Sequence, residues 1–225
     1  MFEDLVFRDV IIQNWQMMQW ERIALTGLLS RIRPEGALEV GVYHGGSLSL
    51  TSQYAREIIA IDIDPEVPGR FHCPANVDLR IGPSQDLIPQ ALADFEARGV
   101  PLHYVLIDAD HSASGVKRDL ELVLAYSPRQ PLVILMHDSG NPDTRRGILS
   151  VDWAANPHLH FVDCDFVPGQ IIEHAVTAAS GEIWGGLGLA YLDPTPRAGF
   201  PEIRQSAQTS IRCLHHCAPD LSILR

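Results

Sequence analysis

The stretch that decides the fold of this chain is GALEVGVYHGG, residues 36–46. It joins a short apolar run to a turn with two consecutive glycines, and residues 47–56 behind it have the pattern of a helix. Glycines in such a turn let the chain bend sharply into a helix and let the backbone approach a ligand closely. The stretch therefore predicts the first strand, turn and helix of a fold in which strands and helices alternate.

The same alternation continues along the chain. Apolar or β-branched runs predict strands at residues 57–63, 77–81, 103–107, 131–136, 160–165 and 186–192. Helical patterns are found at residues 86–98, at 116–126 behind Ser112 as the N-cap, and at 148–156. Strands that alternate with helices in this way indicate βαβ units. The expected class is α/β: a Rossmann-like, doubly wound and mostly parallel sheet with helices on both faces.

A helical segment precedes this core. Residues 7–33 repeat apolar side chains every three or four positions, which predicts one or two helices ending before Pro34. A length of 225 residues suits one domain, so we expect a single domain over residues 1–225. Its parts are the helical segment at 1–33, the core at 34–192 and a C-terminal tail at 193–225.

The composition narrows the class of partner. Lys and Arg number 17 against 28 Asp and Glu, giving a net charge of −11. This balance argues against nucleic acid or an anionic membrane as the main partner. The four cysteines are sparse, no secretory leader is recognised, and no apolar run approaches the roughly 20 residues of a membrane span. We expect a soluble, cytoplasmic protein.

Acidic residues stand where predicted strands end. Asp62 ends the second strand, roughly 20 residues after Gly41, the distance at which an acid accepts hydrogen bonds from a ribose beside a glycine loop. The glycines follow the spacing G-x-x-x-G-G. Dinucleotide-binding proteins have G-x-G-x-x-G instead, so a pyrophosphate site is disfavoured.

Two later strand ends carry carboxylates and imidazoles together. The residues are Asp108, Asp110, His111, His137 and Asp138. Such a set suits a divalent cation, Mg²⁺ if oxygen ligands dominate and Mn²⁺, Fe or Zn²⁺ if His137 is a ligand. It equally suits general base catalysis by His111. A structural role is the alternative, with Asp110 capping the next helix and His111 bonded to nearby backbone.

These motifs together carry a family resemblance. The elements are Glu39-x-Gly41-x-x-x-Gly45, the acid Asp62, the segment IDADHS at 107–112 with Gly115 and Asp119, and HDS at 137–139. In this order they resemble a class I S-adenosylmethionine-dependent methyltransferase. The similarity is greatest to bacterial small-molecule and sugar O-methyltransferases, relatives of the cephalosporin-hydroxylase-like and macrolide-sugar enzymes. It covers about residues 36–138.

The resemblance implies a role for each matching residue. The implied cofactor residues are Glu39, Gly41, Tyr43, Gly45, Gly46, Asp62, Ser84 and Asp108. His111 stands where such families place a catalytic base, with Asp108 beside it as the second catalytic residue. The implied metal ligands are Asp108, Asp138 and His137, although relatives have an acid or amide where this chain has His137. The family also includes members that use no metal.

The sequence therefore predicts transfer of a methyl group from S-adenosylmethionine to a hydroxyl of a small metabolite, a sugar or a natural-product intermediate. Mg²⁺ or another divalent cation is the expected second cofactor. The N-terminal segment is expected as a lid or homodimer contact. The alternatives are a nicotinamide-dependent oxidoreductase and a non-catalytic cofactor-binding assembly protein. The segment CLHHC, residues 213–217, does not follow a recognised zinc spacing and is interpreted as structural.

Overall fold

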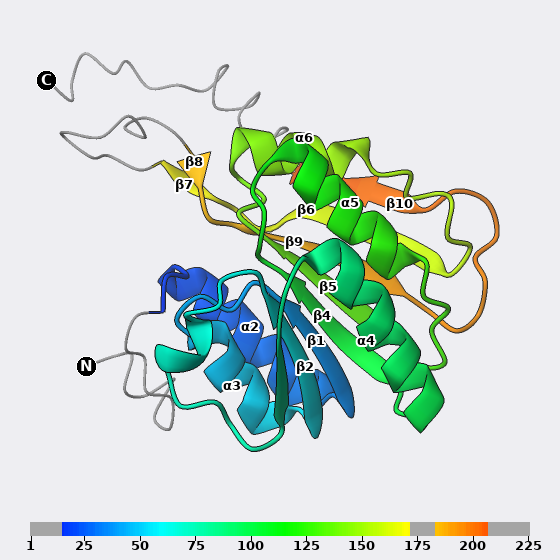
Figure 1. Ribbon diagram of the computed structural model, residues 1–225. Coiled ribbons are helices and arrows are strands. Elements are labelled where there is room, and N and C mark those ends of the chain that lie inside the picture. The colour runs from blue at the N-terminus through cyan, green and yellow to red at the C-terminus, as the bar shows by residue number, and fades with distance from the viewer. Residues whose placement is uncertain (1–14, 172–182, 207–225) are drawn as a thin grey trace, which may run out of the picture.

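One mixed sheet forms the centre of the protein, which the computed structural model describes over residues 15–171 and 183–206 (Figure 1). In sheet order its strands are β10 (Glu202–Arg204), β6 (Leu159–Val167), β9 (Leu187–Leu192), β5 (Leu132–His137), β4 (Leu102–Ile107), β1 (Gly36–Val40), β2 (Glu57–Asp62) and β3 (Val77–Ile81). Neighbours pair in parallel except β9, which is antiparallel to both β5 and β6. The predicted mostly parallel α/β sheet is confirmed.

Helices cover both faces of this sheet (Figure 1). One face carries α4 (Ser84–Arg98), α5 (Ala113–Leu124) and α6 (Pro142–Ser150), and the other carries α2 (Gln19–Ile32) and α3 (Gly46–Tyr54). Side chains alternate between the faces along each strand, so the core divides into two apolar layers. On β1, for example, Leu38 packs with the α4–α6 layer and Ala37 with the α2–α3 layer.

The strand order sets the position of a ligand site. From β1 the chain runs outward to β2 and β3, then returns through α4 to place β4 on the other side of β1. In open α/β sheets ligands bind beyond the carboxyl ends of the strands at such a reversal. The ends of β1 and β4 are therefore the expected entrance to the site.

Several predicted elements differ from the structure. The helix expected at 148–156 was displaced: α6 starts at Pro142 and ends at Ser150. Its true start has a clear cause, because the Asn141 side chain accepts hydrogen bonds from the backbone N–H groups of Asp143 and Thr144 at 2.9 and 3.3 Å. The short strand β10 was not predicted.

A two-stranded sheet was also missed by the sequence analysis. It pairs β7 (Gln170–Ile171) with β8 (Ile183–Trp184) beside the end of β9. Of the N-terminal helical segment only residues from 15 onward are described, and the 213–217 segment lies outside the described residues. Within residues 15–171 and 183–206, no helix is both long and apolar enough to cross a membrane.

Candidate active site

A cavity of about 720 Å³ opens at the carboxyl ends of β1, β2, β4 and β5. Its walls come from the turn after β1, the loop from β3 into α4, the segment after β4 and the end of β5. The N-terminal segment closes it on one side through Gln16, Met18 and Glu21, and Trp184 and Gly185 contribute from the β8 end. The cavity thus lies at the chain reversal, where the topology predicts a ligand.

The glycine turn after β1 is shaped by close backbone packing. Gly41 has φ +94°, and a Cβ there would lie 1.9 Å from the backbone oxygen of Asp108. Only glycine allows the end of β1 to approach the end of β4 this closely. A Cβ on Gly45 or Gly46 would instead meet the side chains of Phe71 and Trp15 at 2.7 and 2.6 Å. Gly41 therefore lines the cavity, whereas Gly45 and Gly46 serve packing behind it.

Asp62 holds the same turn from the side of β2. Its Oδ2 accepts the backbone N–H groups of Val42 and Tyr43 at 2.8 and 3.0 Å, and its Oδ1 accepts that of Asp64 at 2.9 Å. Asp62 and Tyr43 both line the cavity, and the Tyr43 side chain is more than half exposed there. The predicted ribose acid and the glycine turn thus form one continuous wall.

Glu39 lies behind the cavity and does not line it. Its side chain is completely buried on β1, where it accepts hydrogen bonds from Ser47 Oγ at 2.6 Å and Thr51 Oγ1 at 3.3 Å. Burial raises the Glu39 pKa from 4.5 to about 8. The hydrogen bonds from Ser47 and Thr51 lower this pKa, whereas the charge of Asp108 raises it further. Glu39 therefore holds α3, the helix that follows the glycine turn, against β1.

Ser84 begins α4 and lines the cavity near the β3 end. Its hydroxyl donates a hydrogen bond of 2.7 Å to Oδ1 of Asp119, a carboxylate buried on α5. Burial raises the Asp119 pKa, although the hydrogen bond from Ser84 and the charge of Arg118 lower it in part. The bond ties the start of α4 to α5 and fixes this end of the cavity.

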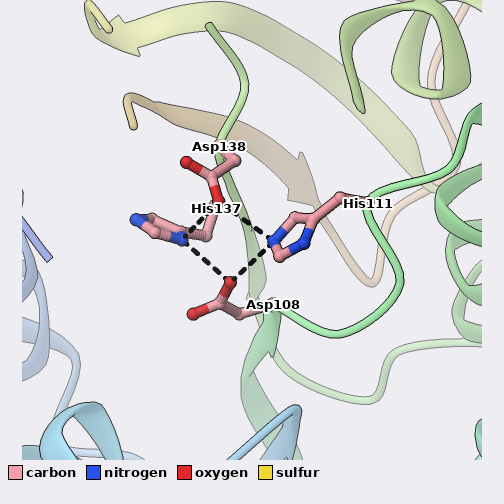
Figure 2. A group of neighbouring side chains, drawn as sticks. All are labelled: Asp108, His111, His137 and Asp138. Atoms are coloured by element: carbon pink, nitrogen blue, oxygen red, sulfur yellow. Dashed lines mark hydrogen bonds and ion pairs between the residues drawn. The ribbon is translucent and has the colours of Figure 1, made fainter. Parts of the chain in front are cut away.

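The carboxylate–histidine residues converge at the other end of the cavity (Figure 2). We call the side chains of Asp108, His111, His137 and Asp138 the Asp–His cluster. One ligand atom from each lies within 4.8 Å of every other. His137 Nδ1 is 2.8 Å from Asp108 Oδ1, and His111 Nε2 is 3.0 Å from Asp138 Oδ2. The strand pairing of β4 with β5 produces this convergence, as the sequence analysis expected for neighbouring strand ends.

The cluster shifts the pKa of its own members. Burial opposes ionisation of Asp108, but the charge of His137, its hydrogen bond of 2.8 Å and the nearby His111 outweigh it and lower the Asp108 pKa to about 2. The nearby carboxylates of Asp108 and Asp138 raise the His111 pKa to about 9. Burial lowers the His137 pKa, yet the carboxylates of Asp108 and Glu21 outweigh it and raise the pKa well above its usual value. The carboxylates of the cluster therefore favour the protonated form of both histidines.

Asp138 is held in an uncommon conformation. Its φ is +53°, and its Oδ1 accepts the backbone N–H of Gly185 at 2.6 Å. A non-glycine residue in the left-handed region is a strained position of the kind found at functional sites. The other oxygen, Oδ2, points to His111 and His137. Asp110, by contrast, accepts the backbone N–H of Ser112 at 2.8 Å and so supports the start of α5. This agrees with the alternative that Asp110 has a structural role.

Glu21 is the site residue that sequence reasoning missed. It is 1% exposed on α2, and its Oε1 lies 3.3 Å from His137 Nε2. Glu21 also accepts the backbone N–H groups of Met18 and Gly186. The signal available in the sequence was an acidic residue on a helix face whose other residues, such as Leu25 and Leu29, are apolar. Trp184 lines the cavity and packs edge-on against His111 with ring centroids 5.9 Å apart.

Comparison with known proteins assigns this architecture to a class. Residues 38–139, from β1 to just beyond β5, match the family model of a methyltransferase domain. An O-methyltransferase from Bacillus cereus, solved in complex with SAH, has a TM-score of 0.58 at 16% identity, covering 81% of this chain and 84% of that one. The O-methyltransferase TomG from Streptomyces achromogenes, involved in tomaymycin synthesis and solved with SAM, has a TM-score of 0.55 at 14% identity, with coverages of 80% and 83%. No curated protein matches the sequence.

The chain has the Rossmann-like fold of these solved O-methyltransferases, with a cavity at the carboxyl ends of its strands. Residues 38–139 thus match a methyltransferase domain, and the two solved proteins that share the fold were determined with SAH and with SAM. The resemblance seen in the sequence is confirmed, and a nicotinamide-dependent oxidoreductase is not favoured.

Proposed function

We propose that this protein transfers the methyl group of S-adenosylmethionine to a hydroxyl of a small metabolite, a sugar or a natural-product intermediate. The observation that carries the proposal is the single cavity that joins the glycine turn and Asp62 to the Asp–His cluster. One end suits the cofactor and the other has the groups that activate a hydroxyl. The acceptor end is lined by Met18, Trp184 and Gly185.

The chain's own residues supply positioning in this proposal. Asp62 presents a carboxylate beside the Tyr43 turn, where we place the ribose of the cofactor, and Gly41 lets the ends of β1 and β4 lie close together at the cavity wall. Ser84 borders the place proposed for the adenine. Bound S-adenosylmethionine supplies an electrophilic methyl group on a sulfonium, and the acids of the cavity complement that positive charge. Holding both reactants in line accounts for much of the rate of such a displacement.

The donor set of the Asp–His cluster fits a divalent cation. Its four ligand atoms lie within 4.8 Å of one another, and His111 Nε2 is a buried atom with no aligned hydrogen bond. We propose Asp108, His137 and Asp138 as ligands. A cation there supplies Lewis acidity, lowering the pKa of an acceptor hydroxyl.

His111 is the cluster residue with access to the acceptor. Its side chain is 41% exposed and lines the cavity wall beside Trp184. In a cation-free cluster it would act as the base, and with a pKa of about 9 it must first lose its own proton at neutral pH. Either role makes His111 necessary for turnover and dispensable for cofactor binding.

Calorimetry with S-adenosylhomocysteine tests the cofactor half of the proposal. We expect the wild type to bind. Asp62→Ala should weaken binding by about tenfold or more, because it removes a charged hydrogen-bond acceptor from the cavity wall. Asp78→Ala, on the exposed surface of β3, is the matched control and should bind as the wild type does. Absence of binding by the wild type would refute the proposal.

Formation of S-adenosylhomocysteine with a panel of hydroxylated sugars and phenols tests the transfer half. His111→Ala should abolish turnover and leave cofactor affinity unchanged within about twofold. Cofactor binding without product from any acceptor would favour the non-catalytic assembly protein. An active His111→Ala variant would remove His111 from the mechanism while leaving the methyltransferase assignment intact.

A further inference from the structure

The strand at one side of the central sheet has an open edge. β10 pairs in parallel with β6 on its inner side, and no strand within residues 15–171 and 183–206 pairs with its outer side (Figure 1). All three residues of β10 are exposed. An edge strand presents unpaired backbone N–H and C=O groups, which can pair with a strand of another chain.

An apolar groove of about 360 Å³ lies directly beside this edge. Its walls come from the end of α6, the residues that follow α6, and the segment that contains β10. Leu149, Phe200 and Ile203 line it and are 43%, 89% and 46% exposed. Three of the eight exposed large hydrophobic side chains among the described residues are thus gathered in this one groove. Such a concentration marks an interaction surface, and none of its residues lines the active-site cavity.

The charges of β10 are arranged symmetrically about Ile203. Side chains alternate along a strand, so Glu202 and Arg204 lie on one face of the sheet and Ile203 on the other. The contacts agree, because Ile203 lines the groove beside α6, whereas the Arg204 guanidinium lies over the Phe161 ring, 4.9 Å from its centroid. Arg204 Nε also donates a hydrogen bond of 2.7 Å to Glu202 Oε1, and both side chains are 58% exposed. The open edge therefore carries an acid, an apolar residue and a base in that order.

Such a strand is complementary to a second copy of itself. In a dimer with two-fold symmetry, identical edge strands that pair in one sheet run antiparallel. With Ile203 of both copies at the axis, Glu202 of each copy faces Arg204 of the partner subunit. Opposite charges at directly facing positions stabilise an antiparallel pair, and like charges there destabilise it. Because facing residues share a face of the sheet, the Ile203 side chains and the two apolar grooves also come together.

Repulsion at the edge is the physical alternative. Charged residues on an edge strand commonly prevent pairing with another chain. A charge of one sign does so because it meets the same charge on a second copy. β10 instead has one charge of each sign, at positions that a two-fold axis through Ile203 exchanges. Together with the exposed apolar groove, this arrangement favours pairing with a second copy.

We propose that two copies of this chain associate through β10, antiparallel and centred on Ile203, so that the sheet of one copy continues into the sheet of the other. The paired strands supply backbone hydrogen bonds and two ion pairs between Glu202 and Arg204 of the partner subunit. Burial of Leu149, Phe200 and Ile203 supplies the apolar centre of the interface. This association concerns a surface away from the active-site cavity and does not depend on the proposed function.

Analytical ultracentrifugation of the full chain over a range of concentrations, at low ionic strength, is the primary test. We expect the wild type to show a reversible equilibrium between monomer and dimer. Glu202→Arg leaves two bases on the edge strand and Arg204→Glu leaves two acids, so each variant faces like charge in its own dimer. Each should therefore associate at least about tenfold more weakly than the wild type. In an equimolar mixture the bases of one variant face the acids of the other, so mixed dimers should form with about the wild-type affinity.

The same charge changes at another exposed ion pair are the matched controls. Glu35 and Arg56 lie 3.7 Å apart and are 52% and 72% exposed, outside both β10 and the groove. Glu35→Arg and Arg56→Glu alter the net charge as the two test variants do, and should associate as the wild type does. Exposed ion pairs contribute little to folding, so all four variants should keep the melting temperature of the wild-type monomer.

Two results would overturn the proposal. A wild type that stays monomeric at every concentration would exclude the dimer, and would leave residues 207–225 of the same chain as the other occupant of the groove. A dimer that neither charge reversal weakens, or variants that do not associate when mixed, would exclude β10 as the contact. Weakening in both single variants with recovery in the mixture is the result that supports it, because changes within one chain cannot produce that recovery.

Discussion

The buried carboxyl of Glu39 makes stability depend on pH in an unusual direction. It lies on β1 with no exposed surface, and burial raises its pKa from 4.5 to about 8. Between these two values the folded protein keeps a proton that the unfolded chain has released. The folded state therefore binds more protons, and the free energy of unfolding falls as the pH rises through this window.

The size of the effect follows from the shift. Each pKa unit corresponds to about 1.4 kcal/mol, so a group that moves from 4.5 to about 8 costs the folded state about 3 kcal/mol between pH 5 and pH 8. Glu39→Gln removes the titration. Gln is close in shape to the protonated carboxyl, and its amide oxygen still accepts the hydrogen bond from the Ser47 hydroxyl.

Urea unfolding of wild type and Glu39→Gln at several values between pH 5 and pH 8 measures the difference directly. The variant should be close to the wild type at pH 5 and more stable by about 3 kcal/mol at pH 8. Glu96→Gln, an exposed position on α4, should follow the wild type at every pH. A constant difference between wild type and Glu39→Gln over this range would refute the reasoning, because it would mean that Glu39 keeps an ordinary pKa in the folded protein.

Two further pairs of substitutions test backbone packing at Gly41 and the buried ion pair of Arg145 by thermal unfolding. Gly41→Ala should lower the free energy of unfolding by about 3 kcal/mol or more, because its Cβ would lie 1.9 Å from a backbone oxygen. Gly99 also has a positive φ but has open space around it, so Gly99→Ala should cost only about 1 kcal/mol. Arg145→Ala should cost about 3 kcal/mol, because it removes the guanidinium that pairs with the buried Asp165 carboxylate. Arg146→Ala, at an exposed ion pair, should cost close to nothing. Equal losses within either pair would contradict the reasoning.

The central strands could be read from the sequence because their apolar runs are continuous. Strands of a parallel sheet are buried on both faces, so β2 and β5 appear as unbroken runs of large apolar residues. The edge strand β10 has three exposed residues and no such pattern, and it was missed. The start of α6 was missed for another reason: the capping residue Asn141 and Pro142 directly follow a functional segment and were not read as a helix start.

The sequence by itself determined the α/β class, the glycine turn and the residues at the strand ends, because these depend on local periodicity and on the topology of parallel sheets. It also placed Asp108 and His137 on neighbouring strands. Only the tertiary structure decided which of the candidate residues face the cavity: Gly41 and Asp62 do, while Glu39 is buried behind it.

The tertiary structure alone also brought Glu21 to His137. These residues are far apart in the chain, and the contact depends on how α2 packs across the ends of β5 and β9. Side-chain spacing along a strand or a helix predicts which face a residue occupies. It carries no information about which distant segment covers that face, because this is settled by the packing of all layers together.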